Sequence, residues 1–237
     1  MFESTSSMEN PERDLARQII ENTNTNLFLT GRAGTGKTTF LRQIREEVHK
    51  RMVVLAPTGI AAINAGGVTI HSFLQLPFAP FIPGMQFRTD QFRMADRKKR
   101  LIRSLDLIVI DEISMVRADL LDSVDAALRR YRDPMRPFGG VQLLLIGDLQ
   151  QLSPVVKDED RELLSRYYDS EYFFSSHALQ KTPFVTVELQ TVYRQSDDDF
   201  LHLLNAVRNS TIDAELHPLL NARYIPAFPP PEGEAHR

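Results

Sequence analysis

The stretch GRAGTGKTT at residues 31–39 constrains this chain more than any other part of it. It matches the pattern G-x-x-x-x-G-K-[ST] at every fixed position, and it lies between a short apolar run and a helical pattern. Glycines allow a turn in which successive backbone N–H groups surround phosphate oxygens, where side chains would block the approach. We expect every residue of this loop to contribute to a nucleotide site, namely Gly31, Arg32, Ala33, Gly34, Thr35, Gly36, Lys37, Thr38 and Thr39.

Two side chains of this loop have separate chemical roles in such a site. Lys37 would reach the β- and γ-phosphates, and the hydroxyl of Thr38 would bind Mg²⁺. The helix that follows would direct its positive end at the same phosphates. The alternative is an ordinary glycine turn before a helix, which the complete match in its strand-and-helix context disfavours.

Short apolar runs alternate with helical patterns along the chain. The runs predict strands at 27–29, 52–55, 105–110, 141–146 and 185–189. Helical spacing of apolar residues predicts helices at 13–22, 38–50, 60–64, 118–132, 160–168 and 197–209. Because the strands are apolar throughout, the fold class is α/β, with a parallel sheet covered by helices on both faces.

The chain reads as one domain over residues 1–225, without an internal repeat or an interior linker. The segment LPFAPFIPG (76–84) holds three prolines, which exclude a regular helix, and we expect it to begin an insertion over about 76–94. Residues 226–237 form a proline-rich tail that we expect to be frayed.

Two carboxylates follow the apolar run that ends at Ile110. A carboxylate at the carboxyl end of a buried parallel strand lies at the sheet edge where ligands bind. Asp111 is therefore placed to hold Mg²⁺, directly or through water, and Glu112 to activate an attacking water. An Asp-Glu pair of this kind is otherwise a solvated turn, but the phosphate loop upstream favours the functional interpretation.

The apolar run 141–146 leads into GDLQQLSP (147–154). Either Gln151 or Gln150 could orient water or sense the γ-phosphate from a position beside Asp111. The alternative is a capped turn in which Asp148 begins a short helix.

Composition excludes several classes of protein. The chain has 237 residues and no cysteine, so it has no disulfide, no thiolate metal site and no cysteine nucleophile. No apolar run is long enough to span a membrane, and the N-terminal segment, with Glu3, Glu9 and Glu12, resembles neither a signal nor a transit peptide. We expect a cytoplasmic (bacterial) or nuclear protein that is not secreted.

The net charge of −3 argues against general electrostatic binding of nucleic acid. Seven basic residues nevertheless lie between Arg88 and Arg103, against Asp90 and Asp96. This local excess could line a path for a nucleic-acid strand, or it could be the solvated face of a helix.

Five ordered stretches together resemble the first RecA-like domain of a superfamily 1 DNA helicase. The resemblance is to the 5′-to-3′ branch, the PIF (petite integration frequency) family and its RecD relatives. The stretches are GRAGTGKTT (31–39), APTGIAAINAGGVTIHSF (56–73), IDEISMV (110–116), GDLQQLSPV (147–155) and ELQTVYRQ (188–195). The second stretch discriminates best, because other phosphate-loop ATPases lack it.

The resemblance implies a P-loop (RecA-like) core that uses ATP and Mg²⁺, with a small wedge-like insertion. It implies metal ligands at Thr38 and Asp111, and a catalytic set of Lys37, Asp111, Glu112, Gln151 and Arg194. It implies single-stranded DNA contacts at Thr58, Gly59, His71 and Ser72. The adenine-reading residue of the family has two candidates here, Asp14 and Gln18. Three aromatic residues could stack on bases or fill the core, namely Phe73, Phe78 and Phe81.

The function implied is translocation along single-stranded DNA and unwinding of duplex or forked DNA, in repair, recombination or telomere maintenance, by a monomer. Such motors close ATP between two RecA-like domains, and residues 196–237 carry neither a second sheet nor the later motifs. We expect a truncated fragment that does not unwind DNA alone, whose second RecA-like domain lies in the full-length protein. One alternative is a phosphate-loop ATPase of another class that remodels protein assemblies. Another is a module that only binds nucleotide and DNA.

Overall fold

The computed structural model describes residues 10–84, 94–193, 198–222 and 224. The sequence predicted one domain over 1–225, whereas the chain groups into two compact units, with the division between Val192 and Tyr193. Each unit is described by itself.

The first unit is built on a six-stranded sheet in the order β3-β2-β4-β5-β1-β6. Every pair of neighbouring strands is parallel, so the predicted α/β class is confirmed. The strands are β1 (Asn26–Gly31), β2 (Met52–Ala56), β3 (Val68–Thr69), β4 (Leu107–Ile110), β5 (Gln142–Ile146) and β6 (Phe184–Leu189).

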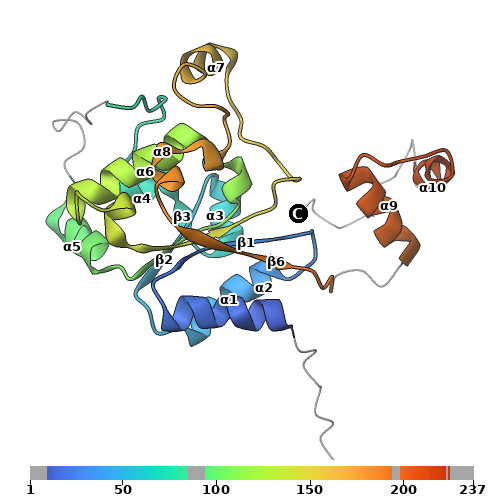
Figure 1. Cartoon of the computed structure of the whole chain (residues 1–237), viewed down its shortest axis with the longest axis horizontal. Coiled ribbons are helices and arrows are strands. Elements are labelled where there is room, and N and C mark those ends of the chain that lie inside the picture. The colour runs from blue at the N-terminus through green and yellow to red at the C-terminus, as the bar shows by residue number, and fades with distance from the viewer. Residues whose placement is uncertain (1–9, 85–93, 194–197, 223, 225–237) are drawn as a thin grey trace, which may run out of the picture. The chain divides into compact units, whose positions relative to one another are not determined.

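Helices cover both faces of this sheet (Figure 1). The helices of the first unit are α1 (Pro11–Asn22), α2 (Lys37–Glu47), α3 (Gly59–Ala65), α4 (Ile70–Leu74), α5 (Asp96–Ser104), α6 (Ala118–Tyr131), α7 (Asp158–Leu164) and α8 (His177–Gln180). Short 3₁₀ helices are η1 (Ile113–Met115), η2 (Pro137–Gly140) and η3 (Phe173–Ser175).

Successive residues of the central strands face opposite cores. In β4, Leu107 and Val109 pack with residues of α1 and α2, whereas Ile108 and Ile110 pack with residues of α4, α6 and α8. All four β4 side chains are fully buried. This explains the uninterrupted apolar run, since a strand buried on both sides has no solvent face.

The structure also contains elements that the sequence did not predict. Strand β3 has two residues and α4 has five, too few for either to repeat a period of two or of 3.6. The helix predicted at 160–168 instead spans 158–164, and the helix predicted at 38–50 ends at Glu47, because the backbone of Val48 is extended.

The predicted insertion at about 76–94 is described over 76–84 and at Met94. Residues 76–84 form no helix or strand, as their prolines predicted. Leu76 and Met94 are both buried in the core that contains α4 and α6. Residues 85–93 and the predicted tail 226–237 lie outside the described residues, so the wedge-like role stays a prediction.

The second unit contains α9 (Asp198–Arg208) and α10 (Leu216–Asn221). Leu203, Ala206 and Leu216 are buried together, with Ile212 packed against them. The sequence predicted α9 at 197–209 but not α10.

Candidate nucleotide and DNA sites

The predicted phosphate loop connects β1 to α2. Gly31 and Gly36 have φ of 149° and 88°, a region that side chains disfavour. A Cβ on Gly31 would lie 2.7 Å from both the Leu189 carbonyl oxygen and Thr35 Oγ1. The buried Thr35 hydroxyl donates to the Arg32 carbonyl at 2.9 Å, which closes the turn. The loop is therefore held by the Thr35 hydroxyl and by the close approach of Gly31 to Leu189.

Lys37 is the first residue of α2, and its ammonium lies over the loop. Lys37 Nζ donates to the carbonyl of Gly31 at 2.5 Å and to that of Arg32 at 3.1 Å. Because α2 begins at this residue, the positive end of the helix dipole and the ammonium are directed at the same space. This combination attracts phosphate groups.

The predicted carboxylates follow β4, the neighbour of β5 in the sheet. The Asp111 N–H donates to the Leu55 carbonyl at 2.9 Å, which extends the pairing with β2 beyond the strand. Burial raises the pKa of Asp111 to about 6, the adjacent Glu112 carboxylate also raises it, and the Lys37 ammonium lowers it. The charge of Lys37 thus acts on Asp111 in the direction opposite to burial.

Glu112 has an unusual backbone conformation. Its φ of 51° and ψ of 44° place it in the left-handed region just before η1. Such a conformation costs a non-glycine residue about 1–3 kcal/mol and is concentrated at functional sites. Sequence spacing predicted the position of Glu112 but gave no signal of this conformation.

The third element of the site follows β5. The Gly147 N–H donates to the Leu29 carbonyl of β1 at 3.2 Å. A Cβ at Gly147 would lie 2.8 Å from Ile113 Cγ2, so only glycine lets the end of β5 pass this close to the turn after Glu112. This contact brings the segments after β4 and β5 together.

Asp148 orients the predicted phosphate sensor. Its buried carboxylate accepts from Gln151 Nε2 at 3.2 Å and from the Gln150 N–H at 3.1 Å. The alternative is half right: Asp148 caps a turn, but no short helix follows it, since the next helix, α7, begins at Asp158. The exposed Gln151 is thus fixed by a residue to which the sequence assigned no part in catalysis.

The predicted DNA contacts follow β2 and β3. The Thr58 hydroxyl caps α3 by accepting from the Ala61 N–H at 3.2 Å. A Cβ on Gly59 would meet nothing within 4 Å, so packing inside the chain does not require glycine there. His71 and the exposed Ser72 lie on α4, which is capped by Thr69.

The three candidate stacking residues lie in different environments. Phe73 is buried, with the ammonium of Lys98 3.7 Å from its ring centre, so of its two predicted roles it has that of a core residue. Phe81 is half-buried. Phe78 is 85% exposed and stacks on His71, with ring centroids 4.7 Å apart and ring planes 19° apart.

Some predicted residues cannot be placed in the site. Arg194 lies outside the described residues, and so do Arg88 and Arg93 of the basic stretch. The other five basic residues of that stretch are on α5, where Lys98 covers Phe73 and Lys99 pairs with Asp96 at 2.9 Å. Asp14 and Gln18 are both exposed, one turn apart on α1, and the choice between them stays open.

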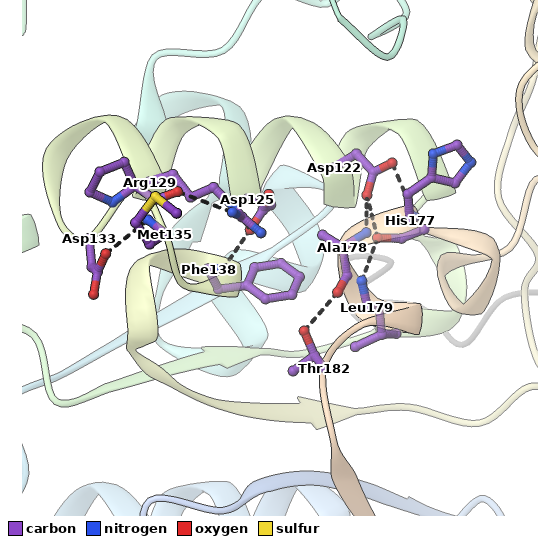
Figure 2. A network of polar contacts seen from close by, with 12 residues as sticks. Asp122, Asp125, Arg129, Asp133, Met135, Phe138, His177, Ala178, Leu179 and Thr182 are labelled. Atoms are coloured by element: carbon purple, nitrogen blue, oxygen red, sulfur yellow. Dashed lines mark hydrogen bonds and ion pairs between the residues drawn. The ribbon is translucent and has the colours of Figure 1, made fainter.

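The carboxylates of three aspartates on α6 accept hydrogen bonds from backbone N–H groups of neighbouring segments. No pattern in the sequence predicts these contacts. Asp122 accepts from the Ser176 hydroxyl and from the N–H groups of His177 and Ala178, which caps α8. Figure 2 shows this network together with Asp125, which accepts from Arg129 and from the Phe138 N–H of η2. Asp119 accepts from the Phe81 N–H at 3.0 Å.

Two kinds of structure are absent from the described part of the chain. None of its helices has both the length and the apolar character needed to cross a bilayer. Its residues form no cluster of three or more His, Asp or Glu side chains that could hold a metal ion.

Comparison with known proteins identifies close relatives. The PIF1-like helicase family model matches residues 9–217. ATP-dependent DNA helicase PIF1 of Saccharomyces cerevisiae is 36% identical over 210 residues, which are 86% of this chain and 23% of that protein. The human protein of the same name is 38% identical over 188 residues, which are 77% of this chain and 27% of that protein.

A solved structure agrees with these matches. The crystal structure of Pif1 helicase from Bacteroides in complex with ADP-AlF3 and single-stranded DNA superposes with a TM-score of 0.86 at 41% identity, over 94% of this chain and 52% of that one. The chain thus spans about a quarter of those two relatives and half of the crystallised protein, and its core is the RecA-like core that the resemblance implied. The chain belongs to the PIF1-like helicase family.

Proposed function

We propose that this chain is the motor domain of a DNA helicase, in which hydrolysis of ATP drives movement along single-stranded DNA. The observation that best supports this is the order of ligand-binding segments along one sheet edge. Strands β4, β5 and β1 are neighbours and lead to Asp111, Gln151 and the phosphate loop. Strands β3 and β2 adjoin them and lead to the predicted DNA contacts. A nucleotide and a strand of DNA would thus bind side by side at the carboxyl edge of the sheet.

The chain's own groups suit ATP with Mg²⁺. Backbone N–H groups of the loop and the Lys37 ammonium would hold phosphate oxygens. The hydroxyl of Thr38 and the carboxylate of Asp111 are hard oxygen ligands of the kind that Mg²⁺ prefers, with phosphate oxygens and water completing its coordination. The metal would supply neutralisation of phosphate charge.

Three further groups would act on the attacking water and the γ-phosphate. Glu112 would accept a proton from the water, and Gln151, fixed by Asp148, would sense the γ-phosphate. Arg194 would neutralise the charge that develops on the transferred phosphoryl group, a contribution of roughly 10³–10⁵ in rate for arginines in this role.

The relatives support the nature of the nucleic acid. Bacteroides Pif1 has been crystallised with single-stranded DNA, and another solved structure concerns the unwinding of forked duplex DNA by two coordinating Pif1 helicases. We propose single-stranded and forked DNA as partners of this chain, and a second RecA-like domain in the full-length protein. We further propose 5′-to-3′ movement by a monomer, in the bacterial cytoplasm or the nucleus, in DNA repair, recombination or telomere maintenance.

The test is ATP hydrolysis by the full-length protein with and without single-stranded DNA. We expect DNA to stimulate turnover. Lys37→Ala should abolish turnover, and Glu112→Gln should abolish it while nucleotide binding persists. Hydrolysis that does not respond to DNA would refute the helicase assignment, and unchanged turnover in Lys37→Ala would remove the loop from the mechanism.

A further inference from the structure

The segment after α4 is hydrogen-bonded to the start of α6 through the carboxylate of Asp119. Leu76 is buried in the core below this segment. Five residues later, the Phe81 N–H donates to Asp119 Oδ2 at 3.0 Å. Asp119 is the second residue of α6 and only 1% exposed. The stretch between Leu76 and Phe81 is thus held at both ends.

Asp119 is itself fixed by an arginine. Arg117 Nε lies 2.7 Å from Asp119 Oδ1, and Arg117 Nη2 lies 2.8 Å from Asp119 Oδ2. This bidentate pair raises the pKa of Arg117, and its planar geometry leaves the carboxylate little freedom to rotate. Arg117 follows Val116, the last residue of the stretch that carries Asp111 and Glu112. The Arg117–Asp119 pair that holds Phe81 is therefore joined to Glu112, the proposed catalytic base, through the backbone of residues 113–116.

Phe78 lies between Leu76 and Phe81, the two anchored positions. Its ring is 85% exposed, yet one face lies against His71 in a near-parallel stack. Burial and the charge of Arg117 lower the pKa of His71, while Asp119 raises it. His71 thus lies near the Arg117–Asp119 pair. The stack adjoins Ser72 and follows β3, within the region of the predicted DNA contacts.

A single exposed phenylalanine needs no explanation in a soluble protein. Here, however, the ring is stacked on a neighbouring ring, and the backbone on both sides of it is anchored. An aromatic ring held in this way can accept a nucleobase on its open face without first losing conformational freedom.

We propose that Phe78 is a base-stacking residue for single-stranded DNA and that Asp119 is its positioning residue. Asp119 holds the Phe81 N–H, which keeps Phe78 stacked on His71 with its outer face open. This inference rests on the proposed function, because it takes single-stranded DNA as the ligand. It assigns a role to a buried carboxylate that accepts hydrogen bonds from Arg117 and from the Phe81 N–H.

The test measures the affinity of this chain for a fluorescein-labelled single-stranded oligothymidylate, by anisotropy at one fixed salt concentration. Phe78→Ala should weaken binding by roughly 5- to 100-fold, the range for loss of one base–aromatic stack. Asp119→Asn should weaken it by a smaller factor, about 3- to 10-fold. In the Phe78→Ala background, Asp119→Asn should have no further effect, because the residue it positions is gone.

Asp125→Asn is the matched control. Asp125 lies on the same helix and accepts from an arginine and a backbone N–H, as Asp119 does, but it holds Phe138 of η2 instead. Asp125→Asn should lower thermal stability and leave the affinity for the oligonucleotide within about twofold of wild type. A purely structural role for Asp119 would make the two variants behave alike.

A second pair of variants removes the hydrogen bond without changing Asp119. Phe81→Pro deletes the N–H donor, whereas Phe81→Ala keeps the donor and deletes the ring. Phe81→Ala measures the effect of losing the ring. We expect Phe81→Pro to weaken binding more than Phe81→Ala does. The inference fails if Asp119→Asn and Phe81→Pro bind as Asp125→Asn and Phe81→Ala do, or if the Asp119 and Phe78 effects multiply. If the wild-type chain does not bind the oligonucleotide, the inference also fails, whereas the proposed function is decided separately by the DNA-stimulated turnover of the full-length protein.

Discussion

At the scale of residues, Gly147 and Glu112 determine how closely the segments of the nucleotide site approach one another. At Gly147, the missing side chain lets β5 end against the turn that carries Glu112. At Glu112, the left-handed backbone turns the chain directly after Asp111. These two positions, rather than the phosphate loop alone, set the distance between the carboxylates and Gln151.

Gly147→Ala tests this contact. The added methyl group would meet Ile113 Cγ2 at 2.8 Å and the Ile113 nitrogen at 3.1 Å, so η1 must shift. We expect the free energy of unfolding to fall by about 1–3 kcal/mol, the usual cost of overpacking. Urea denaturation measures it. Gly59→Ala is the control, because its methyl group meets nothing within 4 Å, and it should leave stability unchanged or raise it slightly. Equal losses in both variants would contradict the packing argument.

The residues of the site were predictable from sequence to different degrees. The phosphate loop and Asp111 could be placed because glycines and an apolar run each have a local signature. The holding of Gln151 by Asp148 could not, since it depends on a side-chain geometry that spacing does not encode. The choice between the two predicted roles of Phe73 could not be made from sequence, because its burial depends on packing against Lys98 and α6, which are distant in the chain.

At the scale of elements, helix α6 binds three other segments of the first unit through its side chains. Its aspartates at 119, 122 and 125 each hold the backbone of a different segment. Apolar periodicity predicted this helix at 118–132 from its buried face. It could not predict the partners of the aspartates, because charged side chains at such spacing are ordinarily solvent-exposed.

Asp122→Ala should destabilise the first unit strongly. The buried carboxylate accepts from one hydroxyl and two backbone N–H groups, and its removal leaves donors at the start of α8 without their acceptor. We expect a loss of about 3 kcal/mol in the free energy of unfolding, measured by urea titration. Glu162→Ala is the control, because it breaks only an exposed pair with Arg166 and should cost less than about 0.5 kcal/mol. A loss of that small size in Asp122→Ala would contradict the capping role.

Arg51, just before β2, forms an ion pair with Asp106, just before β4. This pair makes the free energy of unfolding depend on pH in the acid range. Hydrogen bonds from Arg51 lower the pKa of Asp106 to about 2, below its usual value of 3.8. A carboxyl whose pKa is lower in the folded state adds stability above its unfolded pKa, and this stability disappears as the pH falls from about 4 to about 2. The pair is largely exposed, so the contribution stays below about 1 kcal/mol.

Thermal unfolding of wild type and Asp106→Asn between pH 5 and pH 2 measures this contribution. Wild type should melt at the higher temperature at pH 5, and the difference should close as the pH approaches 2. A difference that is constant over this range would exclude the Arg51–Asp106 pair as its source.

At the scale of the whole molecule, the sheet was the most predictable feature. Its central strands are buried on both faces, so their sequences contain no polar alternation and their parallel arrangement follows. Edge strand β3 was not predictable, since two residues carry no period. The division near Val192 was also missed, because the residues that precede it carry no glycine- or proline-rich linker.

The chain covers about half of its crystallised relative. We expect the isolated 237-residue chain to bind nucleotide weakly and not to separate a forked duplex, because motors of this type close ATP between two RecA-like domains. A strand-separation assay on a fluorescent fork, with the full-length protein as positive control, measures this. Robust unwinding by the isolated chain as a monomer would contradict the expectation.

The alternation of β4 between two cores restricts how the length of this protein can vary. One residue inserted within Leu107–Ile110 would exchange the side chains that face α1 and α2 with those that face α6, and would rotate Asp111 away from the loop of Lys37. Deleting one residue from this strand would have the same two effects. Insertions and deletions are thus tolerable only outside the central strands, for example within residues 152–157, which form no helix or strand, and natural variants of this domain should differ in length there while the interval from Leu107 to Glu112 stays constant.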